Sequence, residues 1–173
     1  MWFPVDDFLR GNFLRVRETA ERYLSELEEQ RFMVAARLIG AYFHGIIAVA
    51  LRIGLRKGNV LRLRWDDVDL EGCFIVVMVK GEKVHRVPFG PGLRAMFVGL
   101  PSYQNSEWVF PSPRGVPFFD CRKRWTRVKS VAGLDPSFRF HDLRHSAASR
   151  LLRHGISLYG VHQFLGHSDA GVT

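Results

Sequence analysis

Residues 141–166 read HDLRHSAASRLLRHGISLYGVHQFLG, and this stretch predicts two consecutive helices. The first helix is expected over residues 141–153 and is closed by Gly155, because glycine readily adopts the left-handed conformation that ends many helices. Ser157 can cap the N-terminus of the second helix, and Gly166 stops it. Two capped helices in succession favour a mainly helical domain.

Further helices are expected on the N-terminal side of this stretch. Residues 34–53 are apolar on nearly all sides, as in a buried central helix, and Gly54 ends that helix. The other predicted helices are a charged one over residues 16–30, a basic one over residues 121–132, and two shorter ones over residues 57–63 and 93–98.

A small antiparallel sheet is expected beside these helices. Residues 73–79 are short, apolar and β-branched, and residues 84–87 alternate apolar and polar side chains, as strands do. The turn between them makes a hairpin over residues 73–88, and residues 108–110 predict a third short strand. The predicted fold class is therefore α+β, mainly α-helical, with a small antiparallel sheet.

The composition is that of a folded protein with a basic surface. Of the 173 residues, 47% are hydrophobic, which is enough to build a core of ordinary size. Lys and Arg number 25 against 17 Asp and Glu, which gives a net charge of +8. Such a charge favours a polyanionic partner, either nucleic acid or an anionic membrane surface, although a solvated basic surface would have the same composition.

The cysteines and the apolar runs bear on the cellular compartment. Cys73 and Cys121 have neither the spacing of a metal site nor that of a disulfide framework, and reduced thiols are typical of cytoplasmic proteins. The first residues lack the pattern of a signal peptide, and the longest apolar run, residues 45–51, is too short to span a bilayer. The sequence therefore predicts a soluble cytoplasmic protein without a membrane partner.

The segment His-Asp-Leu-Arg-His at residues 141–145 carries the strongest chemical signal. His141 and Arg144 are three residues apart, so a helix projects them from one face. The guanidinium matches two oxygens of a phosphate, and a neighbouring histidine can exchange a proton with it, which favours phosphoryl transfer on a nucleic-acid backbone. Two other interpretations stay open: His141 and His145 could share a zinc ion, or the helix is merely charged and its imidazoles are solvated.

Three further residues are candidates for the same site. Arg56 follows the Gly54 turn at the start of a helix, where anions are favoured, although it could be an ordinary surface residue. Lys80 lies at the mouth of the predicted hairpin, where a lysine can protonate a leaving oxygen or can simply be a solvated charge. His167 directly follows the glycine that ends the last predicted helix, and taken alone it is a neighbour of that cap.

Together these segments resemble the catalytic domain of the tyrosine recombinases, the family that includes phage integrases. Each motif is weak alone, but the motifs follow the family's order over residues 35–173. They are Gly-Leu-Arg at 54–56, Leu-Arg-Trp-Asp-Asp-Val-Asp at 63–69, Lys-Gly-Glu-Lys at 80–83 ahead of Val-Pro at 87–88, His-Asp-Leu-Arg-His at 141–145, and Leu-Gly-His at 165–167.

The resemblance implies the tyrosine-recombinase catalytic core and a role for each candidate residue. Arg56 and Arg144 would clamp the scissile phosphate and stabilise the charge on its oxygens in the transition state. Lys80 resembles the lysine that acts as general acid to the leaving 5′ oxygen. His141 and His167 resemble the two histidines that hydrogen-bond the phosphate and assist proton transfer. Because protein cations act on the phosphate, no metal or other cofactor is expected.

The implied reaction is DNA strand cleavage and rejoining, as in site-specific recombination or integration, through a 3′-phosphotyrosine intermediate. The implied partner is double-stranded DNA, on which family members assemble as tetramers. No small-molecule substrate is expected.

The chain departs from the family pattern in three places. Asn59 stands where many members have an acidic residue that supports the active site. Residues 1–30 provide an N-terminal segment and a first helix but no complete arm domain for the other face of DNA, so residues 31–173 are the predicted catalytic domain. The family's tyrosine lies about nine residues after the histidine matched by His167, beyond Thr173, and we therefore expect this chain to bind phosphate without cleaving DNA.

Tyr159 is not expected to replace that tyrosine. It precedes His167 in the middle of a predicted helix, where packing is the expected role. The other functions considered are a type IB topoisomerase-like core, a non-catalytic DNA-binding remnant of an integrase, and a zinc hydrolase built on His141 and His145.

Overall fold

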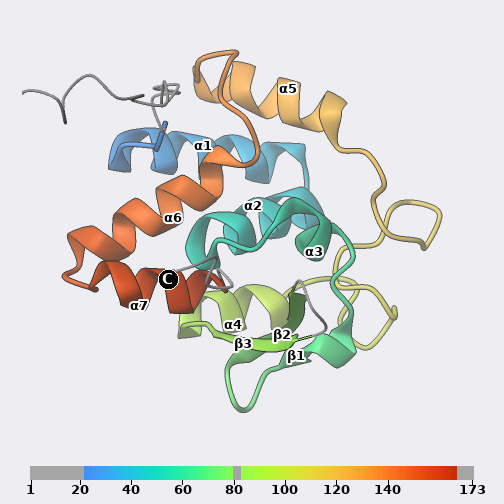
Figure 1. Ribbon diagram of the computed structural model, residues 1–173. Coiled ribbons are helices and arrows are strands. Elements are labelled where there is room, and N and C mark those ends of the chain that lie inside the picture. Colours follow the sequence, from blue (N-terminus) through green and yellow to red (C-terminus); the bar gives the residue numbers. More distant parts are fainter. Residues whose placement is uncertain (1–21, 80–82, 167–173) are drawn as a thin grey trace, which may run out of the picture.

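The computed structural model describes residues 22–79 and 83–166, which form a mainly helical body with one small antiparallel sheet (Figure 1). This is the predicted fold class. In chain order the elements are α1 Glu26–Ile39, α2 Ala41–Ile53, α3 Lys57–Leu61, the 3-10 turn η2 Trp65–Asp67, β1 Val68–Asp69, β2 Phe74–Val79, β3 Lys83–Pro88, α4 Pro91–Val98, α5 Arg122–Ala132, α6 Asp142–Arg153 and α7 Leu158–Leu165.

The first helix starts later than the sequence predicted. A helix was expected over residues 16–30, but residues 22–25 are not helical and α1 begins at Glu26. The boundary is set by a capping box, in which the Ser25 hydroxyl accepts a hydrogen bond from the Glu28 N–H and the Glu28 carboxylate accepts one from the Ser25 N–H.

The buried helix predicted over residues 34–53 is divided at Gly40, whose φ of 141° is not helical. The second part, α2, is buried along most of its length and forms the centre of the core, as expected. Val34 and Leu38, however, lie on α1 and are 60% and 73% exposed. They are exposed because α1 packs against α2 and α5 through the opposite face, which carries Phe32.

The predicted hairpin is confirmed, and the third strand lies elsewhere than predicted. Strands β2 and β3 pair antiparallel, and β1, which precedes the hairpin, pairs with β2 to give the order β1-β2-β3. The segment 108–110 is not part of this sheet, because Trp108 forms only an isolated bridge with Arg64. Val109 and Phe110 are buried in the hydrophobic core, and this burial accounts for their apolar side chains.

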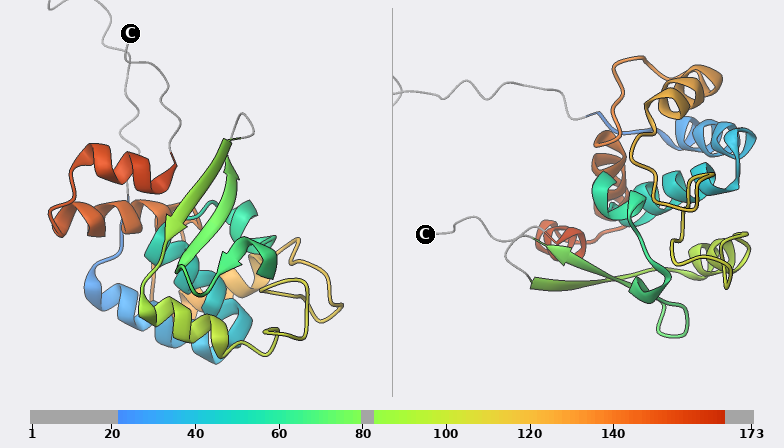
Figure 2. Two further views of the ribbon diagram at one scale, coloured as in Figure 1. Left: turned by 90° about the horizontal axis from the view of Figure 1, so that it is seen from below. Right: turned by 90° about the vertical axis from the view of Figure 1, so that its right-hand side faces the viewer.

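The helices and the sheet form successive layers. The sheet and α4 lie at one end of the molecule, α1 and α5 lie at the other, and α2 runs between them (Figures 1 and 2). At the α1–α5 end, Trp125 meets Phe32 edge-on at 5.5 Å and stacks on Phe138 at 6.0 Å, both between ring centroids. Within residues 22–79 and 83–166, no helix is long and apolar enough to cross a membrane.

Candidate active site

The start of α6 carries two of the predicted site residues. His141 is the N-cap residue and Arg144 lies in the first turn. The Asp142 carboxylate is buried and accepts a hydrogen bond of 2.6 Å from the backbone N–H of Arg139. This bond ties the incoming loop to the first turn of α6 and so fixes the backbone from which His141 and Arg144 project.

Arg144 is buried and held at two points. Its Nη1 donates to the Gly54 carbonyl at 2.6 Å, and its Nη2 donates to the Leu165 carbonyl at 2.7 Å. The two carbonyls lie at the C-terminal ends of α2 and α7. Carbonyl groups at a helix C-terminus have no hydrogen-bond donor within their own helix, and they carry the negative end of the helix dipole. The guanidinium has more N–H groups than these two bonds use, so a rigidly placed cation keeps donors for a further anion.

Gly54 allows the two helix ends to come this close. It has a φ of 67°, in the left-handed region that glycine adopts without strain. A Cβ at this position would overlap the Leu165 side chain and lie 3.3 Å from Ala147 Cβ. The glycine therefore ends α2 and also makes room for the end of α7 beside Arg144.

Arg56 and Arg144 influence each other electrostatically. The pKa of Arg144 is lowered to about 10, first by burial and then by the positive charge of Arg56. Arg56 is exposed at the N-cap of α3, and among the ion pairs of the described residues none involves either arginine. Because the two cations repel each other and neither is paired with a carboxylate, an anion that binds between them is favoured.

His141 lies at the rim of the same region. Its ring meets the His145 ring edge-on, with 4.9 Å between the centroids. Partial burial, and then the charges of His145 and Arg144, lower the pKa of His141 below its ordinary value. The imidazole is therefore neutral at neutral pH, and a neutral imidazole can accept a proton or donate a hydrogen bond.

The structure thus brings together Arg56, Arg144 and His141, whose catalytic role remains a prediction. The two other predicted residues, Lys80 and His167, lie outside the described residues. Lys80 follows β2 directly in sequence, and His167 follows the glycine that ends α7.

Sequence reasoning missed the groups that hold this site together. These are the Gly54 and Leu165 carbonyls and the His85 side chain, whose Nε2 lies 3.0 Å from the Phe164 carbonyl. His85 comes from β3, and a Cβ at Gly166 would lie 2.7 Å from its ring. The sequence predicted both helix-ending glycines but gave no sign that the two ends meet.

The expectation that Tyr159 packs into the core was wrong. Its side chain is 71% exposed, and its hydroxyl accepts a hydrogen bond from Gln163 one turn later. The buried face of α7 carries Val161 and Leu165, and Tyr159 points away from it. The apolar residues of this short helix are too numerous for one face, which is why the pattern was misleading.

The zinc interpretation would require a third ligand beside His141 and His145. Over residues 22–79 and 83–166, no group of three or more His, Cys, Asp or Glu side chains lies close enough together to hold a metal ion.

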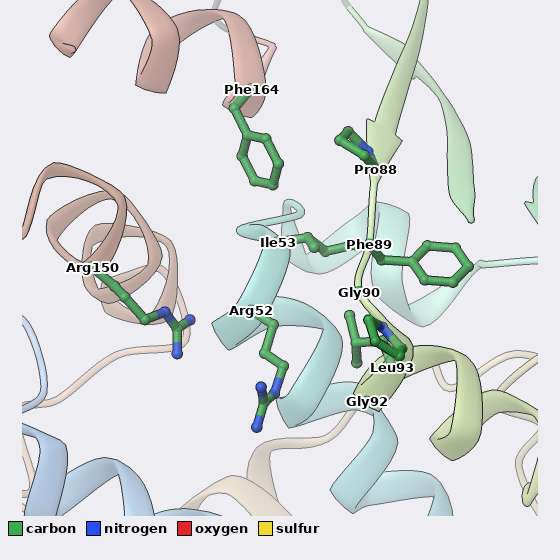
Figure 3. A pocket seen from close by; sticks show the side chains of 10 residues that line it. Arg52, Ile53, Pro88, Phe89, Gly90, Gly92, Leu93, Arg150 and Phe164 are labelled. Carbon is green, nitrogen blue, oxygen red and sulfur yellow. The ribbon is translucent and has the colours of Figure 1, made fainter. Parts of the chain in front are cut away.

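A separate cavity of about 500 Å³ lies between α2, α6, α7 and the β3–α4 junction. The side chains of Arg52 and Arg150 extend from α2 and α6, and that of Phe164 from α7 (Figure 3). Arg150 is already paired with the Glu29 carboxylate at 2.6 Å. None of the described site residues lines this cavity.

Comparison with known proteins identifies the family. Residues 22–173 match the model of the phage integrase family. Tyrosine recombinase XerD of Pseudomonas putida is 32% identical over 186 aligned positions, which cover 98% of this chain. The chain spans 61% of the length of that relative.

Solved structures agree on the fold. The crystal structure of XerA recombinase superposes with a TM-score of 0.74 at 28% identity, over 86% of this chain and 57% of XerA. The XerH recombinase, solved bound to its difH substrate, gives a TM-score of 0.74 at 22% identity, over 85% of this chain and 48% of XerH. The chain therefore belongs to the phage integrase family of tyrosine recombinases, and its described residues have the fold of the catalytic domain.

Proposed function

We propose that this chain is the catalytic core of an enzyme that cleaves and rejoins DNA strands through a 3′-phosphotyrosine intermediate. The observation that carries the proposal is the placement of Arg144, a buried cation held by two backbone carbonyls beside a second cation, Arg56. An anchored arginine beside a second arginine suits a scissile phosphate, because charge develops on its oxygens in the transition state and preorganised donors stabilise that charge.

The remaining roles follow from the resemblance to the family. His141, neutral at the rim of the arginine pair, hydrogen-bonds the phosphate and assists proton transfer. Lys80 is the proposed general acid to the leaving 5′ oxygen, and His167 is the second histidine at the phosphate. The attacking group is a tyrosine about nine residues after His167, which lies outside these 173 residues.

Double-stranded DNA is the proposed partner. Helix α5 presents the exposed cations Arg122, Lys123 and Arg127 and carries no acidic residue. Two proteins of the same fold were solved with such partners: XerH bound to its difH substrate, and the Tn1549 transposon integrase in complex with DNA. Assembly of more than one copy on DNA is part of the proposal, because a lambda integrase fragment of the same fold was solved as a dimer bound to a core site.

Covalent trapping tests the proposal. The substrate is a nicked suicide duplex made from a sequence that the protein selects from a random pool. A chain extended by its natural residues through the tyrosine should form a covalent adduct, and the 173-residue chain should form none. In the extended chain, Arg56→Ala and Arg144→Ala should each abolish the adduct.

Two results would contradict the proposal. An adduct from the 173-residue chain would show that another residue attacks, and mapping the linked peptide would identify it. DNA binding without an adduct from the extended chain would indicate a non-catalytic DNA-binding module.

A further inference from the structure

Lys57 lines two hollows, one beside the segment that precedes α5 and the other beside the first turns of α5. The first has a volume of about 240 Å³ and is lined by Lys57, Gly58, Leu61, Arg62, Phe118 and Phe119. The second has a volume of about 310 Å³, and its cations besides Lys57 are Arg122, Lys129 and Arg139. Among the described residues no Asp or Glu lines either hollow, although the Asp120 carboxylate lies beside Arg122 and interacts with the charge of Lys57. The cations of the two hollows outnumber this carboxylate, so both hollows favour an anionic partner.

Both hollows adjoin the candidate active site. Lys57 directly follows Arg56 at the start of α3. On the other side, Arg139 and Phe140 of the second hollow directly precede His141. A polymer bound at the arginine pair can therefore reach this surface.

Phe119, at the edge of the first hollow, is 84% exposed, which is the largest exposure among the large hydrophobic side chains of the described residues. Both of its neighbours in sequence are anchored. Phe118 is buried and lies under the Arg124 guanidinium, with 4.8 Å between the guanidinium carbon and the ring centroid. The Asp120 carboxylate accepts hydrogen bonds from the backbone and side chain of Arg122, at 2.8 and 2.9 Å. The ring of Phe119 is thus presented to solvent by a fixed backbone.

We propose that Phe119, together with Lys57 and Arg62, forms a contact with double-stranded DNA next to the scissile phosphate. The two cations bind phosphates on either side of the ring, and Phe119 packs against the apolar edge of bases in the groove, such as a thymine methyl group. This assignment rests on the proposed function. It explains why a large apolar side chain stands exposed on a surface where cations outnumber the one neighbouring carboxylate, Asp120.

Salt-dependent DNA binding separates the two components of this contact. The 173-residue chain is titrated with a fluorescent duplex at several salt concentrations, as wild type and as Phe119→Ala, Phe119→Leu, Lys57→Ala and Arg62→Ala. Phe119→Ala should weaken binding about tenfold at every salt concentration, because an apolar contact releases no counterions, and Phe119→Leu should weaken it less. Lys57→Ala and Arg62→Ala should each reduce the slope of log affinity against log salt by about 0.9.

The control is Leu27→Ala, which removes a side chain that is 64% exposed on α1, and it should bind as wild type does. Thermal melting of each variant checks that it is folded. If Phe119→Ala does not fold, the Phe119→Leu variant still tests the contact. Wild-type affinity in Phe119→Ala, with the expected loss in Lys57→Ala and Arg62→Ala, would overturn the role of Phe119 and leave the proposed function intact. A wild-type chain without salt-dependent binding would overturn both.

Discussion

The guanidinium of Arg144 serves the fold and the proposed chemistry at once. Removing it leaves two helix-end carbonyls buried without a donor, and a buried hydrogen bond to a charged group is worth more than an ordinary one. The two carbonyls also fix where the remaining donors point. A fixed position of these donors is needed to stabilise a transition state, because donors that must first reorient stabilise the developing charge less.

Arg144→Lys should lower the free energy of unfolding by about 2–4 kcal/mol, because a lysine keeps the positive charge but cannot bridge both carbonyls. Urea denaturation measures the change. The control is Arg139→Lys, whose side chain is 74% exposed and which should unfold as wild type does. Equal stability of the two variants would show that the carbonyl bonds contribute little.

His141 should titrate below the ordinary histidine value, because partial burial and the charges of His145 and Arg144 lower its pKa. The folded protein then holds fewer protons than the unfolded chain just below pH 6.5, so the contribution of His141 to stability falls as the pH drops through that window and is constant above it. NMR titration of the ring protons measures the pKa. His145→Asn should raise the pKa of His141 and leave that of His44 unchanged, since His44 is lowered by its own burial and by Arg37 and Arg52. A fixed His141 pKa in that variant would remove His145 as a cause.

At the scale of elements, local signals were predictable and long-range contacts were not. Ser157 and the glycines that end α2 and α7 were predicted correctly, because a cap depends on a few neighbouring residues. The break at Gly40 was missed, because the apolar pattern continues through it. The third strand was misplaced for a related reason: residues 108–110 are apolar because they are buried, and burial alone does not specify a sheet.

The candidate site shows the same division. Motif order placed Arg56, His141 and Arg144 in one site, but the meeting of two helix ends at Arg144 depends on packing between residues far apart in sequence. Periodicity says which face of a helix is buried and says little about which neighbour covers it.

Gly54→Ala tests the contact between the ends of α2 and α7. Gly133→Ala is the matched control: both glycines are left-handed, with φ of 67° and 64°, but a Cβ at Gly133 would approach nothing closer than Arg31 Nη1 at 3.9 Å. The control should lose about 1 kcal/mol of stability through backbone strain alone. Gly54→Ala should lose clearly more, because its Cβ also overlaps Leu165 and displaces the end of α7 from Arg144. Equal losses, measured by urea denaturation, would show that the helix ends do not depend on this close approach.

At the scale of the whole molecule, DNA binding requires that the fold gathers cations on one face. The net charge of +8 is a property of the whole chain, whereas DNA can contact only one side of a molecule of this size. Helix α5 lies at the end of the molecule opposite the sheet (Figure 1), and two of its cations, Arg122 and Lys129, line a hollow together with Lys57. If DNA binds at this face, the position of a cation should affect DNA affinity more than the total charge of the protein does.

Removing two charges from α5 should therefore weaken DNA binding more than removing two elsewhere. Lys123→Gln with Arg127→Gln takes two exposed cations from α5, and Arg52→Gln with Arg153→Gln takes two exposed cations from the ends of α2 and α6. Both double variants have the same net charge, so long-range attraction is reduced equally in both. Only the α5 variant should lower the slope of log affinity against log salt, by about 1.8, because only there does each cation release counterions from a phosphate. Anisotropy titrations over a range of salt concentrations measure both slopes. If the two variants lost the same affinity with the same slope, DNA would be attracted by the charge of the whole molecule, and α5 would not be its binding face.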